Sequence, residues 1–208
     1  MENTQPIIER SFVKDNIPFN VGLFKEDYIF AVTKIKTPKQ LIIRQIKHSF
    51  ANDFVFEHHY LHRRLYIARN VSYGLFASDF CVGVCMFGFP VWREYPGIVP
   101  PLDVKETPEL LRLCTMSGLP KNTESFFVAK CMRAMTTDWQ KETGVIPKVI
   151  TSFCDEAMGF SGALYKALNF KFHRRTMGRP SNPGGSHGKW QKNNHQQDAA
   201  KAMYVFYL

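Results

Sequence analysis

Several features that would define a class of protein are absent from this sequence. The 208 residues contain no run approaching the roughly 18 to 20 apolar residues that a membrane-spanning helix needs. The first ten residues are polar and include acids, whereas a secretion signal is basic and then apolar. We therefore expect a cytoplasmic protein without a membrane segment.

Cysteine is sparse and follows no pairing pattern. The chain has five cysteines, an odd number, and no two of them form a CxxC pair. This pattern argues against a disulfide framework and against a zinc site built from thiolates. The sequence predicts reduced thiols in apolar surroundings at Cys81, Cys85, Cys114, Cys131 and Cys154.

Apolar and aromatic residues are present in the amounts typical of a folded protein. Hydrophobic residues make up 45% of the chain, aromatic residues 14% and charged residues 22%. A chain of 208 residues is long enough for one domain with a sizeable core and short for two. We expect a single domain over residues 1–208.

Positive charge exceeds negative charge, and the excess is concentrated near the C-terminus. The formal net charge is +9, and residues 171–208 hold seven basic residues and one acidic residue. A basic surface suits a polyanion partner, because each neutralised phosphate releases counterions. The pattern therefore favours binding to nucleic acid, with a solvated basic loop that has no partner as the alternative.

The spacing of apolar residues predicts alternating strands and helices. Runs rich in β-branched and aromatic residues predict strands at residues 28–35, 73–77, 81–91, 110–116, 148–154, 170–176 and 202–208. Spacings of three and four residues predict helices at residues 39–50, from 122 or 123 to Gly144, and at 159–168. We expect loops at residues 54–70, with a short helix, at 90–108, and at 177–197, a basic segment rich in Gly and Pro.

This order of elements resembles the GNAT-type N-acetyltransferase fold, an α/β fold with a mixed central sheet flanked by helices. The stretch GFSGALYKALNFKF at residues 159–172 is similar to the fourth helix and the following strand of that family. The resemblance implies an acyl donor such as acetyl-CoA as the cofactor.

More specific sequence words are similar to the phage Mom family of DNA-modification proteins. They lie between about residues 54 and 176 and read HHYLHR, YGLF, CMFGFPV, PKNTESFF and FCDEAMGFSGALYKALNF. The resemblance implies a GNAT-like enzyme that places a methylcarbamoyl group on N6 of adenine in phage DNA, which protects the DNA from host restriction. It also implies that the protein acts in the bacterial host cell.

The turn before the second predicted helix is a candidate site for the donor. Free backbone N–H groups and the helix dipole favour an anion at a helix N-terminus. GNAT enzymes hold the pyrophosphate of coenzyme A at this turn, but the Arg-x-x-Gly-x-Gly pattern of that family is absent here. Donors to the pyrophosphate would instead come from Lys121, Asn122, Thr123 and Ser125, and the alternative is a capping motif at Asn122 or Thr123.

Two residues after the predicted strand at 148–154 suit acid–base chemistry. Asp155 follows that strand directly, where a carboxylate can orient the amino group of adenine and accept its proton. Tyr165 lies ten residues later in the next helix, and the resemblance to GNAT enzymes implies that it protonates the leaving group. The alternatives are an N-cap at Asp155 and a core tyrosine with a solvated hydroxyl at Tyr165.

The segment around His58 has the most unusual local composition in the chain. Three histidines lie within five positions, next to Tyr60, Arg63 and Arg64. They can bind a metal, contact phosphate or lie on the surface. A methylcarbamoyl product needs a bond to a methyl carbon and an extra nitrogen, for which a redox metal such as iron would be useful. The candidate metal ligands, and the further catalytic candidates, are His59 and Tyr60 with Asp155.

The C-terminal basic residues are candidates for contact with double-stranded DNA. Basic side chains with no acidic neighbour occupy residues 171–192, interleaved with Gly and Pro. The predicted phosphate contacts are Arg63, Arg64, Arg174, Arg175, Arg179 and Lys189, and the alternative is a solvated insertion. Two rival functions stay open: an ordinary N-acetyltransferase acting on RNA, protein or a small amine, and a DNA-binding module with a vestigial pocket.

Overall fold

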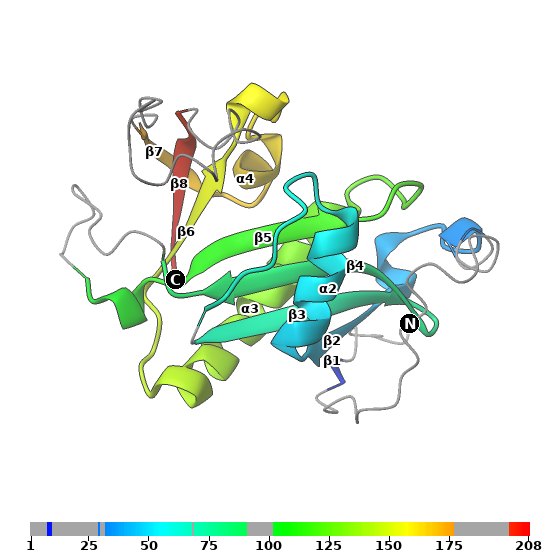
Figure 1. Ribbon diagram of the computed structural model, residues 1–208, viewed down its shortest axis with the longest axis horizontal. Coiled ribbons are helices and arrows are strands. Elements are labelled where there is room, and N and C mark those ends of the chain that lie inside the picture. Colours follow the sequence, from blue (N-terminus) through cyan, green and yellow to red (C-terminus); the bar gives the residue numbers. More distant parts are fainter. Residues whose placement is uncertain (1–7, 10–28, 30–31, 68, 91–101, 177–199) are drawn as a thin grey trace, which may run out of the picture.

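The computed structural model describes residues 8–9, 29, 32–67, 69–90, 102–176 and 200–208. Its strands form one eight-stranded mixed sheet in the order β1-β2-β3-β4-β5-β6-β8-β7 (Figure 1). The strands are β1 Ile8–Glu9, β2 Ile42–Ile46, β3 Asn70–Ala77, β4 Phe80–Gly88, β5 Glu109–Thr115, β6 Val149–Cys154, β7 Lys171–Arg175 and β8 Ala202–Tyr207. The helices are α2 His48–His58, α3 Thr123–Thr143 and α4 Ala163–Ala167, with short 3-10 turns η1 Pro38–Gln40, η2 Val104–Glu106 and η3 Glu156–Met158.

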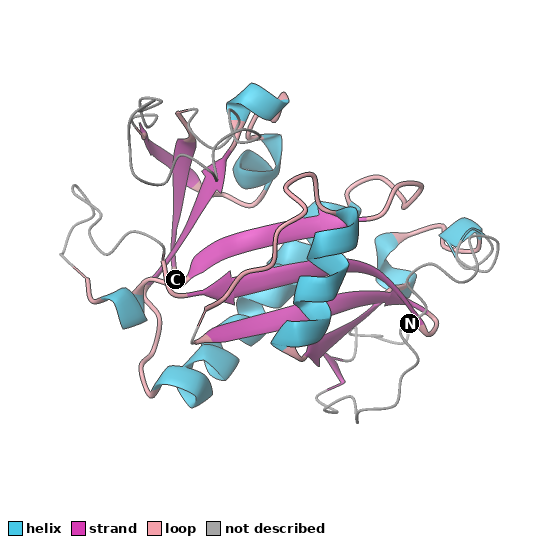
Figure 2. Cartoon of the chain, viewed as in Figure 1, coloured by secondary structure: helices cyan, strands magenta, loops and turns pink. Residues whose placement is uncertain are grey.

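Helices cover both faces of the sheet. Helix α2 crosses β3 and β4 on the face nearest the viewer, and α3 lies behind the same strands (Figures 1 and 2). Ala51, Phe54 and Val55 of α2 pack in one cluster with Val84 and Met86 of β4. The side chains of α3 pack in a second cluster on the opposite face, which includes Phe127, Cys131, Met135 and Trp139. The fold is therefore a three-layer sandwich of helix, sheet and helix.

The predicted hairpin at the centre of the sheet is confirmed. Strands β3 and β4 pair antiparallel from Asn70↔Gly88 to Ala77↔Phe80. Neighbouring side chains of β4 point to opposite faces, so Cys85 contributes to the α3 side and Met86 to the α2 side. Burial on both faces explains why these strands read as nearly continuous apolar runs in the sequence.

Strands β5 and β6 are neighbours for only a short distance. They pair in parallel at Glu109↔Thr151 and Leu110↔Ser152, and then diverge. Strand β5 continues through Thr115, whereas β6 turns away toward α4 and η3 (Figure 1). The sheet therefore opens into a V whose floor lies at Leu110 and Ser152.

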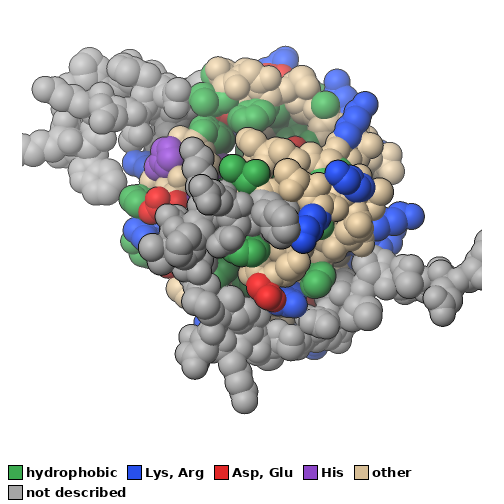
Figure 3. Space-filling view, turned by 90° about the vertical axis from the view of Figure 1, so that its right-hand side faces the viewer, with side chains coloured by type: hydrophobic (Ala, Val, Ile, Leu, Met, Phe, Trp, Pro, Cys, Tyr) green, Lys and Arg blue, Asp and Glu red, His purple; other side chains and the backbone are tan. Residues whose placement is uncertain are grey.

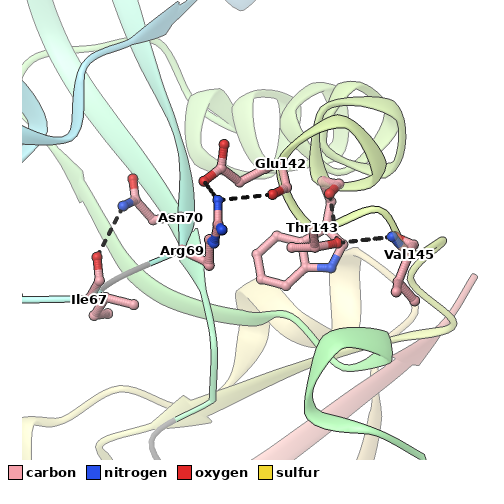
Figure 4. Close-up of polar contacts among 7 residues, drawn as sticks. Ile67, Arg69, Asn70, Glu142, Thr143 and Val145 are labelled. Atoms are coloured by element: carbon pink, nitrogen blue, oxygen red, sulfur yellow. Dashed lines mark hydrogen bonds and ion pairs between the residues drawn. The ribbon is translucent and has the colours of Figure 1, made fainter.

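Polar contacts fix the end of α3 against the start of β3. The Arg69 guanidinium donates to the backbone carbonyl and the carboxylate of Glu142 at 3.3 and 3.2 Å (Figure 4). The Thr143 hydroxyl accepts from the Val145 N–H at 3.2 Å, just beyond the predicted helix stop at Gly144. Gly144 has a φ of 76° and donates to the Gln140 carbonyl, so the predicted helix end is confirmed.

Two predictions about the N-terminal elements are wrong. In the predicted strand at 28–35, the described residues Ile29, Val32 and Thr33 are helical. The predicted helix at 39–50 is divided into η1, strand β2 and the start of α2. Ile42, Ile43 and Ile46 are β-branched and pair with β3, and this tertiary pairing outweighs their helix-like spacing.

The remaining elements agree with the sequence to different extents. Strands β5, β6, β7 and β8 and helix α3 confirm the predictions for those regions. The predicted helix at 159–168 is shorter, because Gly159 and Gly162 have left-handed backbones and α4 begins only at Ala163. The short helix expected near residue 54 is the second half of α2.

The loop at 177–197 and most of the loop at 90–108 lie outside the described residues. No helix in the described part of the chain is long and apolar enough to cross a membrane.

The cysteine prediction is confirmed. None of the five cysteines forms a disulfide, four of them are buried and Cys81 is half-buried. Burial raises the pKa of the Cys81 thiol to about 12 and that of the Cys114 thiol to about 11. These two thiols therefore stay protonated and inert at neutral pH.

Candidate active site

Tyr165 places its hydroxyl at the floor of the V between β5 and β6. The phenol oxygen lies 2.9 Å from Ser152 Oγ and 3.3 Å from the Phe153 carbonyl. The Tyr165 hydroxyl donates to the Phe153 carbonyl and the Ser152 hydroxyl donates to the Leu110 carbonyl at 3.0 Å, while either hydroxyl can act as the donor in the contact between them. Burial raises the pKa of Tyr165 above its ordinary value, although the bond with Ser152 lowers it in part. The phenol therefore keeps its proton at neutral pH, as an acid must.

Asp155 is a buried carboxylate that accepts no hydrogen bond from the described residues. Its side chain is 3% exposed, and both carboxylate oxygens are buried without a hydrogen-bond partner in the described part of the chain. An ion pair at 3.4 Å joins Oδ2 to Nζ of Lys201. The sheet register explains the pair, because Cys154 lies opposite Ala202 and the next residue outward on each strand is Asp155 or Lys201.

The alternative role of Asp155 as a helix cap finds no support in the geometry. Asp155 occupies the N-cap position of η3, but its side chain makes no capping hydrogen bond. Its two oxygens are therefore free to accept hydrogen bonds from a ligand.

His59 and Tyr60 lie at the end of α2, close to Asp155. Their rings stack with centroids 4.4 Å apart, and Tyr60 contacts the ring of Phe160 at 5.7 Å. Burial lowers the pKa of His59 to about 4, with a further contribution from the positive charge of Arg112. Burial also raises the pKa of Tyr60, and the negative charge of Asp155 adds to the effect. The structure thus brings together three of the residues predicted as catalytic, and at neutral pH both rings are uncharged.

The predicted iron site does not fit this arrangement. His59 Nδ1 accepts the Leu61 N–H at 3.1 Å, so the neutral ring carries its proton on Nε2 and has no free lone pair for a metal. Among the described residues, no three His, Cys, Asp or Glu side chains form a group that could hold a metal ion. The candidate ligands His59, Tyr60 and Asp155 therefore do not support an iron site.

Arg112 is a site residue that the sequence did not reveal. It lies on β5 beyond the point where β6 diverges, and its guanidinium is partly buried, with Nη1 donating to the Leu111 carbonyl at 2.6 Å. The Nε atom is buried and has no hydrogen-bond partner among the residues that the structure describes. Burial lowers the pKa of Arg112, and the neighbouring Tyr60 and Glu109 partly offset this effect. A buried cation beside Tyr60 gives the site a group that can bind an anion or a carbonyl oxygen.

The turn before α3 offers fewer side-chain donors than its composition indicates. The Thr123 hydroxyl donates to the Pro120 carbonyl at 2.6 Å, and the Ser125 hydroxyl donates to the Asn122 carbonyl at 3.0 Å. Asn122 is the N-cap residue with a φ of 67°, and its side chain makes no capping bond, so the alternative of a side-chain cap at this residue is not supported. Lys121 and Asn122 are exposed. The Thr123 N–H donates to the Pro120 carbonyl, so the groups left for an anion are Lys121, the Asn122 amide and the N–H groups of the two helix residues that follow Thr123.

The predicted DNA-binding arginines differ in how freely they can reach a phosphate. Arg64 donates to the Asp53 carboxylate at 2.9 Å and lies over the Phe56 ring, and Arg175 makes two bonds to Glu156 at 3.0 and 3.1 Å. Arg174 is exposed on β7, and Arg63 is half-buried after α2. Arg179 and Lys189 lie outside the described residues.

Apolar and basic side chains gather on the side of the molecule at which β5 ends. Hydrophobic side chains surround a hollow in the upper part of this face, and Lys and Arg side chains follow its right-hand edge (Figure 3). This is the side toward which the V between β5 and β6 opens in Figure 1.

Comparisons with known proteins agree with this geometry. A model of the Mom protein family matches residues 40–205. Among solved structures, the chain is similar to Arabidopsis thaliana NAA60 in complex with acetyl-CoA, with a TM-score of 0.54, 11% identity, and coverage of 81% of this chain and 98% of that chain. It is also similar to a GNAT family acetyltransferase from Elizabethkingia anophelis with acetyl-CoA bound, with a TM-score of 0.52, 9% identity, and coverage of 81% and 99%. None of the curated proteins matches the chain. The predicted GNAT-like α/β fold is confirmed.

Proposed function

Because the chain belongs to the Mom protein family, we propose that it is a transferase that modifies the N6 amino group of adenine in double-stranded DNA. The group that the family resemblance implies is methylcarbamoyl, and the modified adenine protects phage DNA from host restriction. The adenine is taken out of the base stack to reach the site, because a stacked base whose N6 is paired to thymine cannot enter a buried site.

The unbonded carboxylate of Asp155 is the observation that carries this proposal. A buried charged group without hydrogen bonds costs free energy, which a fold tolerates where a ligand completes the site. The N6 amine of adenine is a poor nucleophile, because its lone pair is delocalised into the ring. Two buried acceptor oxygens suit this amine, since one can orient its N–H and then take its proton.

Lys201 balances the charge of this carboxylate. It lies 3.4 Å from Oδ2 and supplies a compensating positive charge. Arg112 places a partly buried positive charge near Tyr60, where it can stabilise negative charge that develops on an attacked carbonyl oxygen.

The V between β5 and β6 supports an acyl donor of the acetyl-CoA type. When bound, such a donor supplies an activated thioester carbon to the site. The first-turn N–H groups of α3 and Lys121 would hold its pyrophosphate, although Glu124 brings a carboxylate into the same turn. Tyr165 holds a proton at the floor of the V and gives it to the departing group.

A methylcarbamoyl product needs two more reactants than acetyl transfer does. In the product N6 is bonded to the methyl carbon, and the carbonyl carbon carries an amide nitrogen. The bond from N6 replaces a C–H bond of the methyl group, which is a two-electron oxidation, and the amide nitrogen takes the place of the thiol at the carbonyl carbon. An oxidant and a nitrogen donor are therefore part of the complete reaction. Within this reaction, Asp155 accepts the proton from N6 and Tyr165 donates a proton to the departing group.

Nucleoside mass spectrometry of DNA from expressing cells tests the proposed function. The digest is expected to contain a deoxyadenosine heavier than the unmodified one by a methylcarbamoyl group. A digest that contains only unmodified or methylated deoxyadenosine would contradict the proposal. Cells that express Asp155→Asn serve as the matched control, because they contain a protein of the same size and fold.

A further inference from the structure

We propose that Phe160 provides the stacking surface for the nucleic-acid base that enters the site, a role that rests on the proposed function. Phe160 is 50% exposed, although burial of a phenylalanine side chain would stabilise the fold. Folding therefore does not account for the position of this ring. A planar ligand stacked on its open side would cover it.

The backbone of Phe160 lies next to Cys154, the residue that precedes Asp155. The turn after β6 runs through η3 and folds back, so that Cys154 Sγ lies 3.4 Å from the Phe160 carbonyl. Gly159 and Gly162 have φ values of 82° and 71° on either side, a conformation that allows this reversal. Asp155 and Phe160 therefore stand on the two arms of one tight turn.

Tyr60 supports the ring from a second element. Its centroid lies 5.7 Å from that of Phe160, and the two planes are inclined at 53°. Tyr60 thus packs on one side of the ring, and the exposed half of Phe160 remains open to a ligand. Every base has a flat π-face, so this contact suits any extruded base, while the oxygens of Asp155 would favour bases that carry an amino group over thymine, which carries none.

Binding of two short single-stranded probes tests the stacking role without relying on catalysis. The probes are an oligodeoxyadenylate and an abasic oligomer of the same length, whose phosphates are the same but whose bases are absent. Phe160→Ala and Phe160→Leu are expected to weaken oligodeoxyadenylate binding by about five- to a hundredfold, the range for loss of one stacked base. Both variants should leave binding of the abasic oligomer unchanged, and Phe160→Tyr should bind both probes like the wild type.

Tyr207→Ala is the matched control. Tyr207 is also aromatic and 48% exposed, but it pairs with Val149 at the opposite end of β6. Equal oligodeoxyadenylate binding by Phe160→Ala and Tyr207→Ala would overturn the stacking role. Equal weakening of both probes by Phe160→Ala would also overturn it, because the loss would then not concern the base.

The same variants distinguish this inference from the proposed function. If DNA from cells expressing the wild type is modified while Phe160→Ala binds oligodeoxyadenylate normally, only the stacking role fails. If that DNA is unmodified while Phe160→Ala loses base-dependent binding, the base site stands and the proposed reaction fails.

Discussion

At the scale of single residues, Asp155 differs from the other buried aspartate in the core. Asp138 is also buried, but the Tyr73 hydroxyl donates to it at 2.9 Å and Lys141 lies 3.6 Å away. Asp155 has only the ion pair with Lys201 among the described residues. Asp138 is thus satisfied by its surroundings in the usual way, whereas Asp155 has spare acceptors that point to a ligand.

His59 gives the first prediction at this scale, a loss of stability in mild acid. Its pKa is about 4 in the folded protein and about 6.5 in an unfolded chain, because burial disfavours the charged ring. Above pH 6.5 both states are neutral, and as the pH falls toward 4 only the unfolded state takes up a proton. The free energy of unfolding should therefore decrease by about 2 kcal/mol between pH 7.5 and pH 5 through this residue alone.

Urea denaturation of wild type and His59→Gln at the two pH values measures this contribution. Glutamine cannot take up the proton, and its side-chain oxygen can still accept the Leu61 N–H. The variant should show a smaller loss of stability between pH 7.5 and pH 5 than the wild type. An equal loss in both proteins would show that His59 is not the titrating group.

At the scale of elements, the turn between β6 and α4 depends on Gly162. Its φ is 71°, and a Cβ at this position would collide with the Tyr204 hydroxyl. Tyr204 belongs to β8 and stacks on the Tyr165 ring at 4.7 Å, so it has little room to move away. The contact ties the position of the turn to that of the candidate acid.

Gly162→Ala is expected to destabilise the fold and displace the turn. Gly159→Ala is the control, since Gly159 has a φ of 82° but a Cβ added there would meet no described atom within 4 Å. Gly159→Ala should lower the free energy of unfolding by roughly 1 kcal/mol through backbone strain alone. Gly162→Ala should lower it by about 1–3 kcal/mol more because of the collision. Thermal or urea unfolding of both variants measures the difference in stability. Equal destabilisation would show that the Tyr204 side chain moves aside and that no collision occurs.

Local signals in the sequence sufficed for some elements and failed for others. Helix α3 has an apolar face and a glycine stop at Gly144, and β3 and β4 form a hairpin around a short turn, so each could be predicted from its own residues. Strand β2 could not, because its spacing is also compatible with a helix and only pairing with β3 decides between the two.

Some residues of the candidate site could likewise be predicted from the sequence, and others could not. Asp155 and Tyr165 could be singled out because they follow an apolar strand at short intervals along the chain. Arg112 and Lys201 could not, because they reach the site through the order of β5, β6 and β8 in the sheet, which links distant segments. Phe160 carried the weakest signal, since only its exposure in the folded chain distinguishes it from a core residue.

At the scale of the whole molecule, the excess of positive charge leads to a prediction about the proposed binding of DNA. Arg174 is exposed, whereas Arg175 is held by Glu156 in a two-bond ion pair. Arg174→Ala should weaken binding on all DNA sequences alike and reduce the slope of log K against log salt by about one. Arg175→Ala should change that slope less, because its guanidinium already has an anionic partner.

Titration of labelled duplex DNA at several salt concentrations measures both slopes. Unchanged affinity and slope in Arg174→Ala would show that this edge of the sheet does not contact the phosphate backbone. A larger change in Arg175→Ala than in Arg174→Ala would show that Glu156 releases its arginine to DNA.

The proposed function depends on the Asp155 carboxylate taking a proton from adenine N6. The most direct test compares the rate of adenine modification by purified wild type and Asp155→Asn on the same DNA. Asparagine keeps the size of the side chain but cannot accept the proton, and no capping bond is lost, so the variant should melt like the wild type. We predict that modification falls by at least about a hundredfold, the usual effect of losing an acid–base group. A variant that melts like the wild type and modifies adenine at a comparable rate would contradict the account.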